Sequence, residues 1–468
     1  MQIIESIIFL LTIITLVLWV FNKSIRKQYL MILIGLSFLS LILHFVLEDT
    51  RWQLYPLYIA GILLIGIAIL SLFEIIGFQN KRVFRVIILV LSGLLVIISG
   101  ISNFVFPMYE IPLPSGDFLI GTESFVLIDE NREEFYGEGG QRKIKIQFWY
   151  PAESTDGYDL VPWLEDGKVV AQSLATDTGL PSFVLNHTSQ IMSNSYREAP
   201  INETYSEYPI VVISHGWRGF KNLHTDLAEE LASLGYIVVG IDHTYGSVAT
   251  VFSDDEIAYL NLDALPDRET TSNFLEYANT LVNTYAGDIT LTLNELEKMN
   301  TGEVLSRFEG KLDLENIGLL GHSTGGGAGA AVAINDDRVK ALFGMDSWVE
   351  PISDTEIAIG LDIPAIFLRS ESWDTGPNNV NLMRLVMQNI DNTRLYQIKG
   401  TTHYDFSMAY MYSPLTKNLG MTGELEGDYL VSIFKSMIRE FFDQTLKVDN
   451  NVGLIEISNP WDELLKLR

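Results

Sequence analysis

The stretch Gly321-His322-Ser323-Thr324-Gly325 lies inside Ile317-Gly-Leu-Leu-Gly-His-Ser-Thr-Gly-Gly-Gly-Ala-Gly-Ala330, between a short apolar run and a run of small residues. A Gly-x-Ser-x-Gly pattern between a strand and a helix is typical of a nucleophile elbow, a sharp turn that exposes a serine hydroxyl. The turn strains the backbone at the serine, and Gly321 and Gly325 leave room where neighbouring backbone passes close. The small residues that follow suit a helix that packs tightly and points its N-terminus at developing negative charge.

Apolar strands and amphipathic helices alternate on both sides of this stretch. Continuous apolar runs that alternate with helices indicate a mostly parallel sheet wrapped by helices, and here the α/β-hydrolase fold. In such sheets the chemistry lies at the carboxyl ends of the strands. The expected strands are 125–127, 143–150, 208–214, 236–241, the run before Ser323, 339–345, 363–368 and 394–398, and the expected helices are 222–234, 271–299 and 427–446.

The first 106 residues contain four apolar runs, each about as long as the roughly 20 residues that cross a bilayer core. The first run lacks a basic leader and is followed by three more, so a cleavable signal peptide is not expected. We therefore predict four transmembrane helices in residues 1–106, a Pro-containing linker at 107–116 and an α/β-hydrolase domain at 117–468. The four runs are about 3–21, 29–47, 56–78 and 83–106.

Basic residues fall in the first and third loops between these runs. Because cytoplasmic loops are enriched in Lys and Arg, both loops are expected in the cytoplasm, with both termini and the large domain outside the cell membrane. The loop residues are Lys23, Arg26, Lys27, Lys81, Arg82 and Arg85.

The two parts of the chain differ sharply in charge. Residues 1–106 carry seven Lys or Arg and four Asp or Glu, which leaves 24 and 55 for residues 107–468. Such an acidic domain argues against nucleic acid as a partner and against docking on anionic lipid by charge. The chain has no cysteine, which excludes disulfides, a thiolate zinc site and a thiol nucleophile. No cofactor or metal is expected.

Ser323 requires a base, and His403 is the one histidine downstream of the elbow, in a loop after the last expected strand. The base requires a carboxylate that orients it. Asp346 ends the strand after the elbow helix, whereas Glu371 and Asp374 follow the next strand, and the fold can use either strand. We favour Asp346 because it lies at its strand end beside a tryptophan, but Glu371 and Asp374 remain open.

The oxyanion hole is expected to use the backbone N–H of Thr324 and one from the loop His215-Gly-Trp-Arg-Gly219, with Trp217 as the donor. His215 is interpreted as structural, and Asp242-His243 as packing at a sheet end. Residues 152–206 are interpreted as a partly helical insertion near the substrate site. Its apolar side chains are candidates for a surface rim, namely Trp163, Leu164, Phe183 and Val184.

Taken together, these motifs resemble the plasma-type platelet-activating-factor acetylhydrolases among the α/β-hydrolases, over most of residues 107–468. The resemblance rests on Phe148-Trp-Tyr-Pro151, Tyr208-Pro-Ile-Val-Val-Ile-Ser-His-Gly216, Gly321-His-Ser-Thr-Gly-Gly326, Met345-Asp-Ser-Trp348, Pro364-Ala-Ile-Phe-Leu-Arg-Ser-Glu371 and the His403 loop. It implies the triad Ser323, Asp346 and His403 with Trp217 and Thr324 at the oxyanion, and calcium-independent hydrolysis of short or oxidised sn-2 acyl groups of phospholipids. The four apolar runs depart from the familiar secreted members.

The expected function is that of a membrane-anchored serine esterase acting on lipid esters. Two other interpretations stay open: a non-catalytic membrane sensor or scaffold that retains the fold, and a cutinase-like esterase of non-lipid esters. Acyl length, head group and oligomeric state are not predicted by the sequence.

Overall fold

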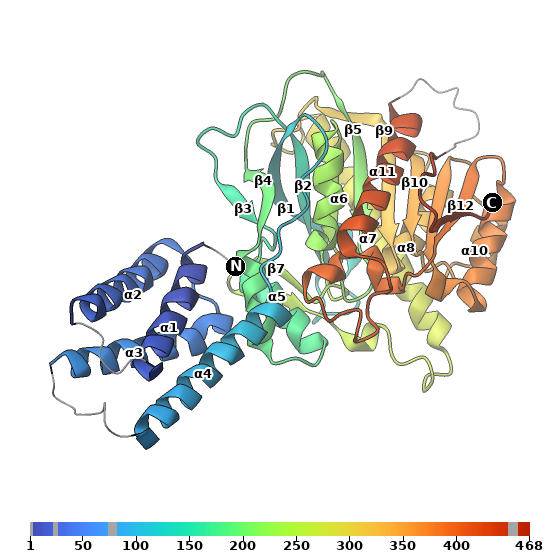
Figure 1. Ribbon diagram of the computed structural model, residues 1–468. Coiled ribbons are helices and arrows are strands. Elements are labelled where there is room, and N and C mark those ends of the chain that lie inside the picture. Colours follow the sequence, from blue (N-terminus) through green and yellow to red (C-terminus); the bar gives the residue numbers. More distant parts are fainter. Residues whose placement is uncertain (1–2, 22–26, 74–81, 448–456) are drawn as a thin grey trace.

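The computed structural model describes residues 3–21, 27–73, 82–447 and 457–468. A helical bundle formed by the N-terminal part lies beside a larger α/β domain (Figure 1). Lys23, Arg26 and Lys81, which enter the orientation argument, lie outside the described residues.

The described part of the bundle contains four apolar helices. Among the described residues, three helices are long and apolar enough to cross a membrane, and the apolar helix Ile3–Leu18 is shorter. Three of the four expected spans are therefore supported, and the first stays a prediction. The bounds are α1 Ile3–Phe21, α2 Lys27–Leu47, the short 3-10 helix η1 Trp52–Leu54, α3 Tyr55–Leu72 and α4 Arg82–Val105.

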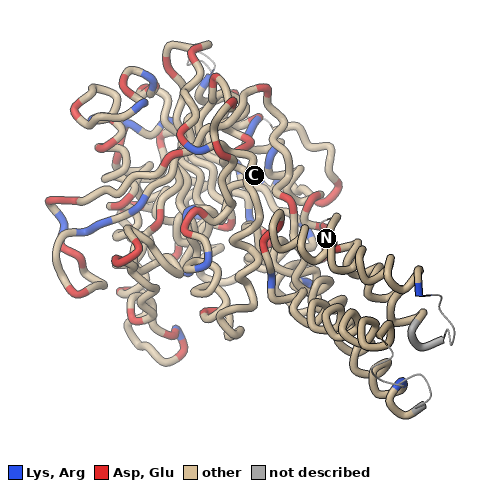
Figure 2. Tube along the Cα trace, turned by 90° about the vertical axis from the view of Figure 1, so that its left-hand side faces the viewer, with Lys and Arg blue, Asp and Glu red and all other residues tan. Residues whose placement is uncertain are grey.

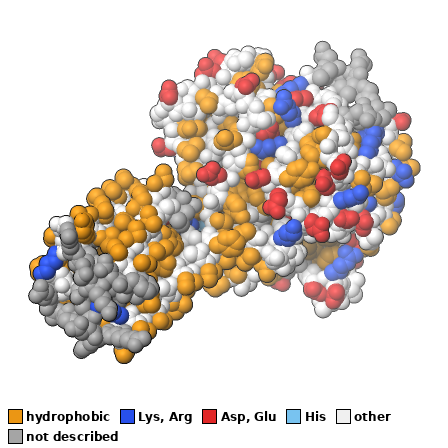
Figure 3. Space-filling view, in the orientation of Figure 1, with side chains coloured by type: hydrophobic (Ala, Val, Ile, Leu, Met, Phe, Trp, Pro, Cys, Tyr) orange, Lys and Arg blue, Asp and Glu red, His pale blue; other side chains and the backbone are white. Residues whose placement is uncertain are grey.

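Apolar side chains predominate on the part of the bundle surface that is coloured by residue type in Figure 3. The described trace of the bundle carries few charged residues compared with that of the α/β domain (Figure 2). Two charged side chains of the described bundle, Glu5 and Arg51, are buried. Arg51 donates two hydrogen bonds to Glu5, at 2.8 and 2.6 Å, and His44 bonds Glu48 and Tyr58. Pairing of this kind is what an apolar environment demands of charged groups.

The α/β domain is built on a sheet of eleven strands within the described residues, in the order β13-β12-β11-β10-β9-β5-β6-β2-β1-β4-β3. The six neighbours from β12 to β6 run parallel, while β2 pairs antiparallel with β6 and with β1. The strands are β1 Leu119–Glu133, β2 Gln141–Ala152, β3 Leu160–Pro162, β4 Met192–Arg197, β5 Tyr208–Ser214, β6 Ile237–Asp242, β9 Leu312–His322, β10 Val339–Met345, β11 Ala365–Ser370, β12 Thr393–Ile398 and β13 Leu464–Lys466.

Helices cover both faces of this sheet (Figure 1). One buried cluster joins the sheet to α7, α8, α9 and α10, and a second joins its other face to α6 and α11. The helices are α5 Gly167–Asp177, α6 Thr225–Ser233, α7 Phe274–Asn300, α8 Thr324–Asn335, α9 Asp354–Ile359, α10 Gly376–Gln388 and α11 Gly427–Leu446, with short 3-10 helices η3 Ser182–Gln190, η4 Lys221–His224, η5 Leu262–Ala264, η6 Glu371–Trp373, η7 His403–Phe406 and η8 Met408–Met411.

The predicted α/β-hydrolase fold is confirmed, and the central strands lie where the apolar runs predicted them. The structure adds elements that the sequence analysis did not identify: the helix α10, the edge strand β13 and a separate hairpin formed by β7 Ala249–Ser253 and β8 Glu256–Tyr259. The insertion at 152–206 is partly helical as expected, and it also contributes β3 and β4 to the sheet edge.

The insertion packs against the end of the bundle. Trp52 donates its indole N–H to the Val184 carbonyl oxygen at 3.0 Å, and its ring meets that of Phe183 edge-on. Trp163 and Leu164 are each 1 % exposed and Val184 is 7 % exposed. The expected surface rim is therefore wrong for these three residues, because they form part of a buried cluster shared with the bundle end.

Candidate active site

Ser323 occupies a strained turn between β9 and α8. Its φ of 54° lies in the left-handed region that side chains rarely adopt. A Cβ on Gly321 would lie 2.5 Å from the Gly325 oxygen, and one on Gly325 would lie 2.1 Å from the Ser214 oxygen. The motif glycines are therefore required by the close approach of backbone, as the elbow interpretation predicted.

His403 reaches Ser323 from the loop after β12. Its Nε2 lies 2.9 Å from the Ser323 Oγ. Trp373 stacks flat on one side of the imidazole, with ring centroids 4.0 Å apart and planes at 9°. His322 lies 4.8 Å away at 31°. Two flat side chains thus pack against the ring, while its two nitrogens take part in the hydrogen bonds to Ser323 and Asp346.

Asp346 directly follows β10 and completes this path. Its Oδ2 lies 2.7 Å from the Nδ1 of His403, and its carboxylate also accepts hydrogen bonds from the backbone N–H and the hydroxyl of Ser370, both at 2.8 Å. The side chain is buried. Of the three carboxylates left open by the sequence, the structure places Asp346 at the imidazole, while Glu371 accepts from the backbone N–H of Gly400.

Buried histidines near the site contribute no positive charge. Burial, followed by the neighbouring His403, holds the pKa of His322 well below its usual value. Burial likewise lowers the pKa of His224 to about 4. Both imidazoles are therefore neutral near pH 7. His322 thus does not repel a positive charge that develops on the neighbouring imidazole of His403.

The expected oxyanion donors, Trp217 and Thr324, lie next to each other and close to Ser323. Thr324 is the first residue of α8, so its N–H belongs to the unsatisfied first turn of a helix. Trp217 donates its N–H to the Thr324 hydroxyl at 3.3 Å, which brings the two expected donors to one place. A Cβ on Gly216 would lie 2.8 Å from the Ser323 Cβ, so the loop can pass this close to the serine only as glycine.

Sequence reasoning missed Ser370 and Trp373, which contact Asp346 and His403. Both lie just past the expected strand 363–368. Ser370 falls inside the stretch Pro364–Glu371 that carries the resemblance, but no pattern assigned a role to either residue. In the described part of the chain no group of three or more His, Asp or Glu side chains is arranged to hold a metal ion.

The sheet order, the elbow between β9 and α8, and the hydroxyl, imidazole and carboxylate at neighbouring strand ends define an α/β-hydrolase. The family model described as platelet-activating factor acetylhydrolase, isoform II, matches residues 104–464, and the chain belongs to that family.

Relatives and a solved structure agree with this assignment. The chain is 20 % identical over 384 residues to platelet-activating factor acetylhydrolase of Canis lupus familiaris, covering 76 % of this chain and 80 % of the relative. It is 22 % identical over 389 residues to the enzyme of that name from Gallus gallus, covering 76 % and 87 %. A ferulic acid esterase from Streptomyces cinnamoneus shares the fold, with a TM-score of 0.61 and 21 % identity over 77 % of this chain and 100 % of that chain. The chain is a carboxylic ester hydrolase.

Proposed function

We propose that this protein is a membrane-anchored serine esterase that removes short or oxidised acyl groups from phospholipids or similar lipid esters. The observation that supports the proposal is the continuous hydrogen-bond path from Asp346 through His403 to the Ser323 hydroxyl, with separations of 2.7 and 2.9 Å. Such a path activates a serine hydroxyl that is otherwise a weak nucleophile at neutral pH.

In the proposed mechanism the His403 Nε2 takes the Ser323 proton as the Oγ attacks the ester carbonyl carbon. The backbone N–H groups of Trp217 and Thr324 bind the resulting oxyanion, and Asp346 stabilises the imidazolium. His403 then returns the proton to the leaving alcohol. A water molecule, deprotonated by the same imidazole, releases the acid from the acyl-enzyme and restores the serine.

The lipid substrate is proposed from two independent observations. The relatives carry the name platelet-activating factor acetylhydrolase, which places their activity on an acetyl ester of a phospholipid. The apolar bundle packs directly against the α/β domain through the insertion and the Trp52 contact. An esterase held at a bilayer in this way meets lipid esters at high local concentration.

We also propose that the bundle is integral to the cell membrane and that the α/β domain and both termini lie outside the cell. Three apolar helices of sufficient length support insertion. The basic loops between the apolar runs support the orientation.

The catalytic proposal is tested by covalent labelling of the purified, detergent-solubilised full chain with a fluorophosphonate probe. We expect labelling that is lost in Ser323→Ala while the variant keeps the wild-type melting temperature. Folded wild-type protein that fails to label would favour the non-catalytic scaffold. Comparing turnover of short-chain phospholipids with that of soluble p-nitrophenyl and polyester-like esters separates a lipid esterase from a cutinase-like one.

The orientation is tested with single cysteines, because the chain has none of its own. Leu305 in the α/β domain is 93 % exposed, and Gln28 lies near the start of α2. A membrane-impermeant maleimide applied to intact cells should label Leu305→Cys but not Gln28→Cys. The opposite pattern would reverse the proposed topology.

A further inference from the structure

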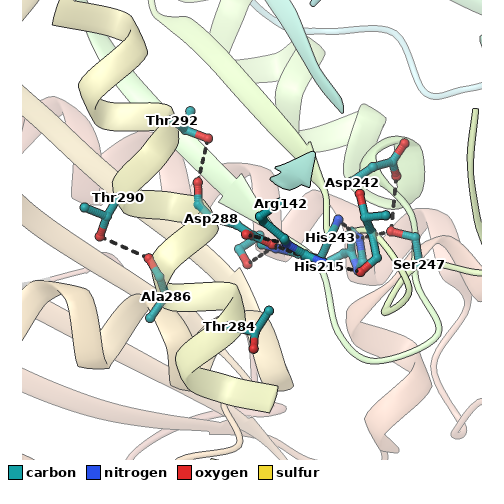
Figure 4. Close-up of polar contacts among 12 residues, drawn as sticks. Arg142, His215, Asp242, His243, Ser247, Thr284, Ala286, Asp288, Thr290 and Thr292 are labelled. Carbon is teal, nitrogen blue, oxygen red and sulfur yellow. Dashed lines mark hydrogen bonds and ion pairs between the residues drawn. The ribbon is translucent and has the colours of Figure 1, made fainter. Parts of the chain in front are cut away.

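A second Ser, His, Asp arrangement lies next to the loop His215–Gly219, which we call the oxyanion loop. Figure 4 shows His243 and Asp288 of this arrangement. Ser214 ends β5, His243 follows β6, and Asp288 lies in α7. The Ser214 Oγ is 2.8 Å from the His243 Nε2, and the His243 Nδ1 is 3.0 Å from the Asp288 Oδ2. The three side chains are at most 2 % exposed. Since no substrate reaches them, this arrangement is not a second catalytic centre.

Arginine side chains fix the charge of this network. Arg142 donates to both Asp288 carboxylate oxygens, at 3.0 and 2.6 Å, and Arg132 donates to Oδ1 at 2.8 Å. Burial alone would raise the pKa of Asp288, but Arg142 and the hydrogen bond from His243 outweigh it and hold the carboxyl ionised. Burial lowers the pKa of His243, which is therefore neutral.

These protonation states determine the direction of each hydrogen bond. An ionised carboxylate only accepts, so His243 carries its proton on Nδ1 and donates to Asp288. Its Nε2 then accepts from the Ser214 hydroxyl. Tyr285 stacks on the imidazole, with centroids 3.7 Å apart at 13°, so the ring has one orientation and one tautomer.

The turn that carries His243 also holds the oxyanion loop at three points. Ser214, the first point, immediately precedes the loop. His215 accepts from the Ser247 hydroxyl at 2.9 Å and donates to the Gly216 oxygen at 2.7 Å. Arg218 donates its backbone N–H to the Gly246 oxygen at 2.9 Å. Between the anchors His215 and Arg218 lie Gly216 and Trp217, and the Trp217 N–H is the proposed oxyanion donor.

We infer that the network of Arg142, Asp288, His243 and Ser214 positions the oxyanion loop, by fixing the 243–247 turn from which the loop is held. Its members are positioning residues, since none touches the substrate or the reacting atoms. The inference rests on the proposed serine esterase function and names the part of the molecule that orients the Trp217 N–H.

The test is a double variant of the full chain, Ser214→Ala with His243→Phe. Phenylalanine keeps the flat contact with Tyr285, and removing both polar partners together leaves neither of them unpaired, so little stability should be lost. Asp288 keeps its arginine partners. Thr292→Val is the matched control, since it removes another buried hydrogen bond in α7, from Thr292 to the Asp288 carbonyl oxygen at 2.9 Å.

Loss of a single oxyanion donor costs about 10²–10³ in kcat, so displacing one should lower kcat by about tenfold or more, with KM changed less than about threefold. The inhibition constant of an alkylboronic acid, whose adduct with Ser323 places an oxyanion in the hole, should rise by the same factor. Thr292→Val should keep kcat, KM and the inhibition constant within about twofold of wild type. An unchanged kcat in the folded double variant, or a rise in KM alone, would overturn the inference.

Two further measurements keep the outcome decisive. If the double variant does not fold, Ser214→Ala alone must still lower kcat by about threefold or more, and wild-type turnover in it overturns the inference. Amide hydrogen exchange over residues 215–219 does not depend on catalysis. It should be about tenfold faster in the double variant and in Ser214→Ala than in the wild type. A wild-type protein without esterase activity refutes the proposed function, whereas unchanged exchange refutes the positioning network.

Discussion

Replacing Asp346 by asparagine distinguishes the proposed triad from its alternatives. In the structure the Asp346 carboxylate accepts from His403 Nδ1 at 2.7 Å and from Ser370 at 2.8 Å. Asparagine has nearly the same shape, and its oxygen can still accept from Ser370. Its amide nitrogen would then face His403 Nδ1 and donate to it. The imidazole would carry its proton on Nε2, where it can no longer accept the proton of Ser323.

The expected loss follows from this wrong tautomer. In serine hydrolases with a Ser-His-Asp triad the corresponding change lowers kcat by about 10⁴, and at about 1.36 kcal/mol per decade this is roughly 5 kcal/mol of transition-state stabilisation. KM should change only a few-fold, since Asp346 is buried and does not contact the substrate. The Ser370 N–H keeps its bond to the remaining oxygen. The Ser370 hydroxyl now donates to Oδ2 and in the variant can instead accept from the amide nitrogen at that position, so the melting temperature should fall little.

Steady-state hydrolysis of p-nitrophenyl acetate by the solubilised full chain measures this loss, with an active-site titration to count functional molecules. Glu371→Gln and Asp374→Asn are the matched controls, because each removes one of the carboxylates that the sequence left open, and both should keep kcat within about threefold. A fall of about 10³ in either control, with Asp346→Asn still active, would refute the assignment of the triad acid.

Two further predictions concern single side chains. Trp373→Ala removes the ring stacked 4.0 Å from His403. Since a cation over an aromatic face is worth about 0.5–2 kcal/mol, kcat should fall by roughly 2- to 30-fold. A Trp373→Phe variant that restores most of kcat would separate stacking from bulk, and full activity of Trp373→Ala would contradict the role of Trp373 in stabilising the imidazolium. Burial raises the pKa of Asp226 to about 6, so the folded state favours the neutral acid. The free energy of unfolding should therefore decrease as pH rises from about 4 to 6, by about 3 kcal/mol at 1.36 kcal/mol per pKa unit. Denaturant titrations of Asp226→Asn should lack this decrease, and identical pH profiles for the variant and the wild type would disprove the prediction.

The proposed nucleophile and base could be singled out from the sequence because their signals are local. Ser323 lies in a motif whose glycines are required by its own turn, and His403 is the one histidine downstream of it. The choice among the three carboxylates was harder, because it depends on which strand end meets the imidazole in space. The left-handed φ of 43° at Asp346, which turns the chain at the end of β10, is absent from any sequence pattern.

Long-range contacts explain what the sequence did not reveal. Ser370 and Trp373 acquire their roles only because β11 lies beside β10 and its end faces His403. Trp163 and Leu164 are apolar residues of a mostly polar insertion, and the sequence does not show which partners cover them. Their burial depends on partners far along the chain, including the bundle end at Trp52.

The buried cluster around the insertion also links the bundle to the site itself. It contains Val184 and Leu185 of η3, Ile111 of the linker, and Met408 and Met411 of η8, with Trp52 and Phe106 packed against it. The helix η8 begins two residues after η7, which carries His403. The bundle end and the segment following the proposed base therefore share one packed core. Removing residues 1–106 would uncover apolar side chains of this core, at about 25 cal/mol for each Å² exposed to water, and would loosen the support of the His403 loop. The bundle is thus part of the architecture that holds the site, which is why each assay proposed for the active site requires the full chain.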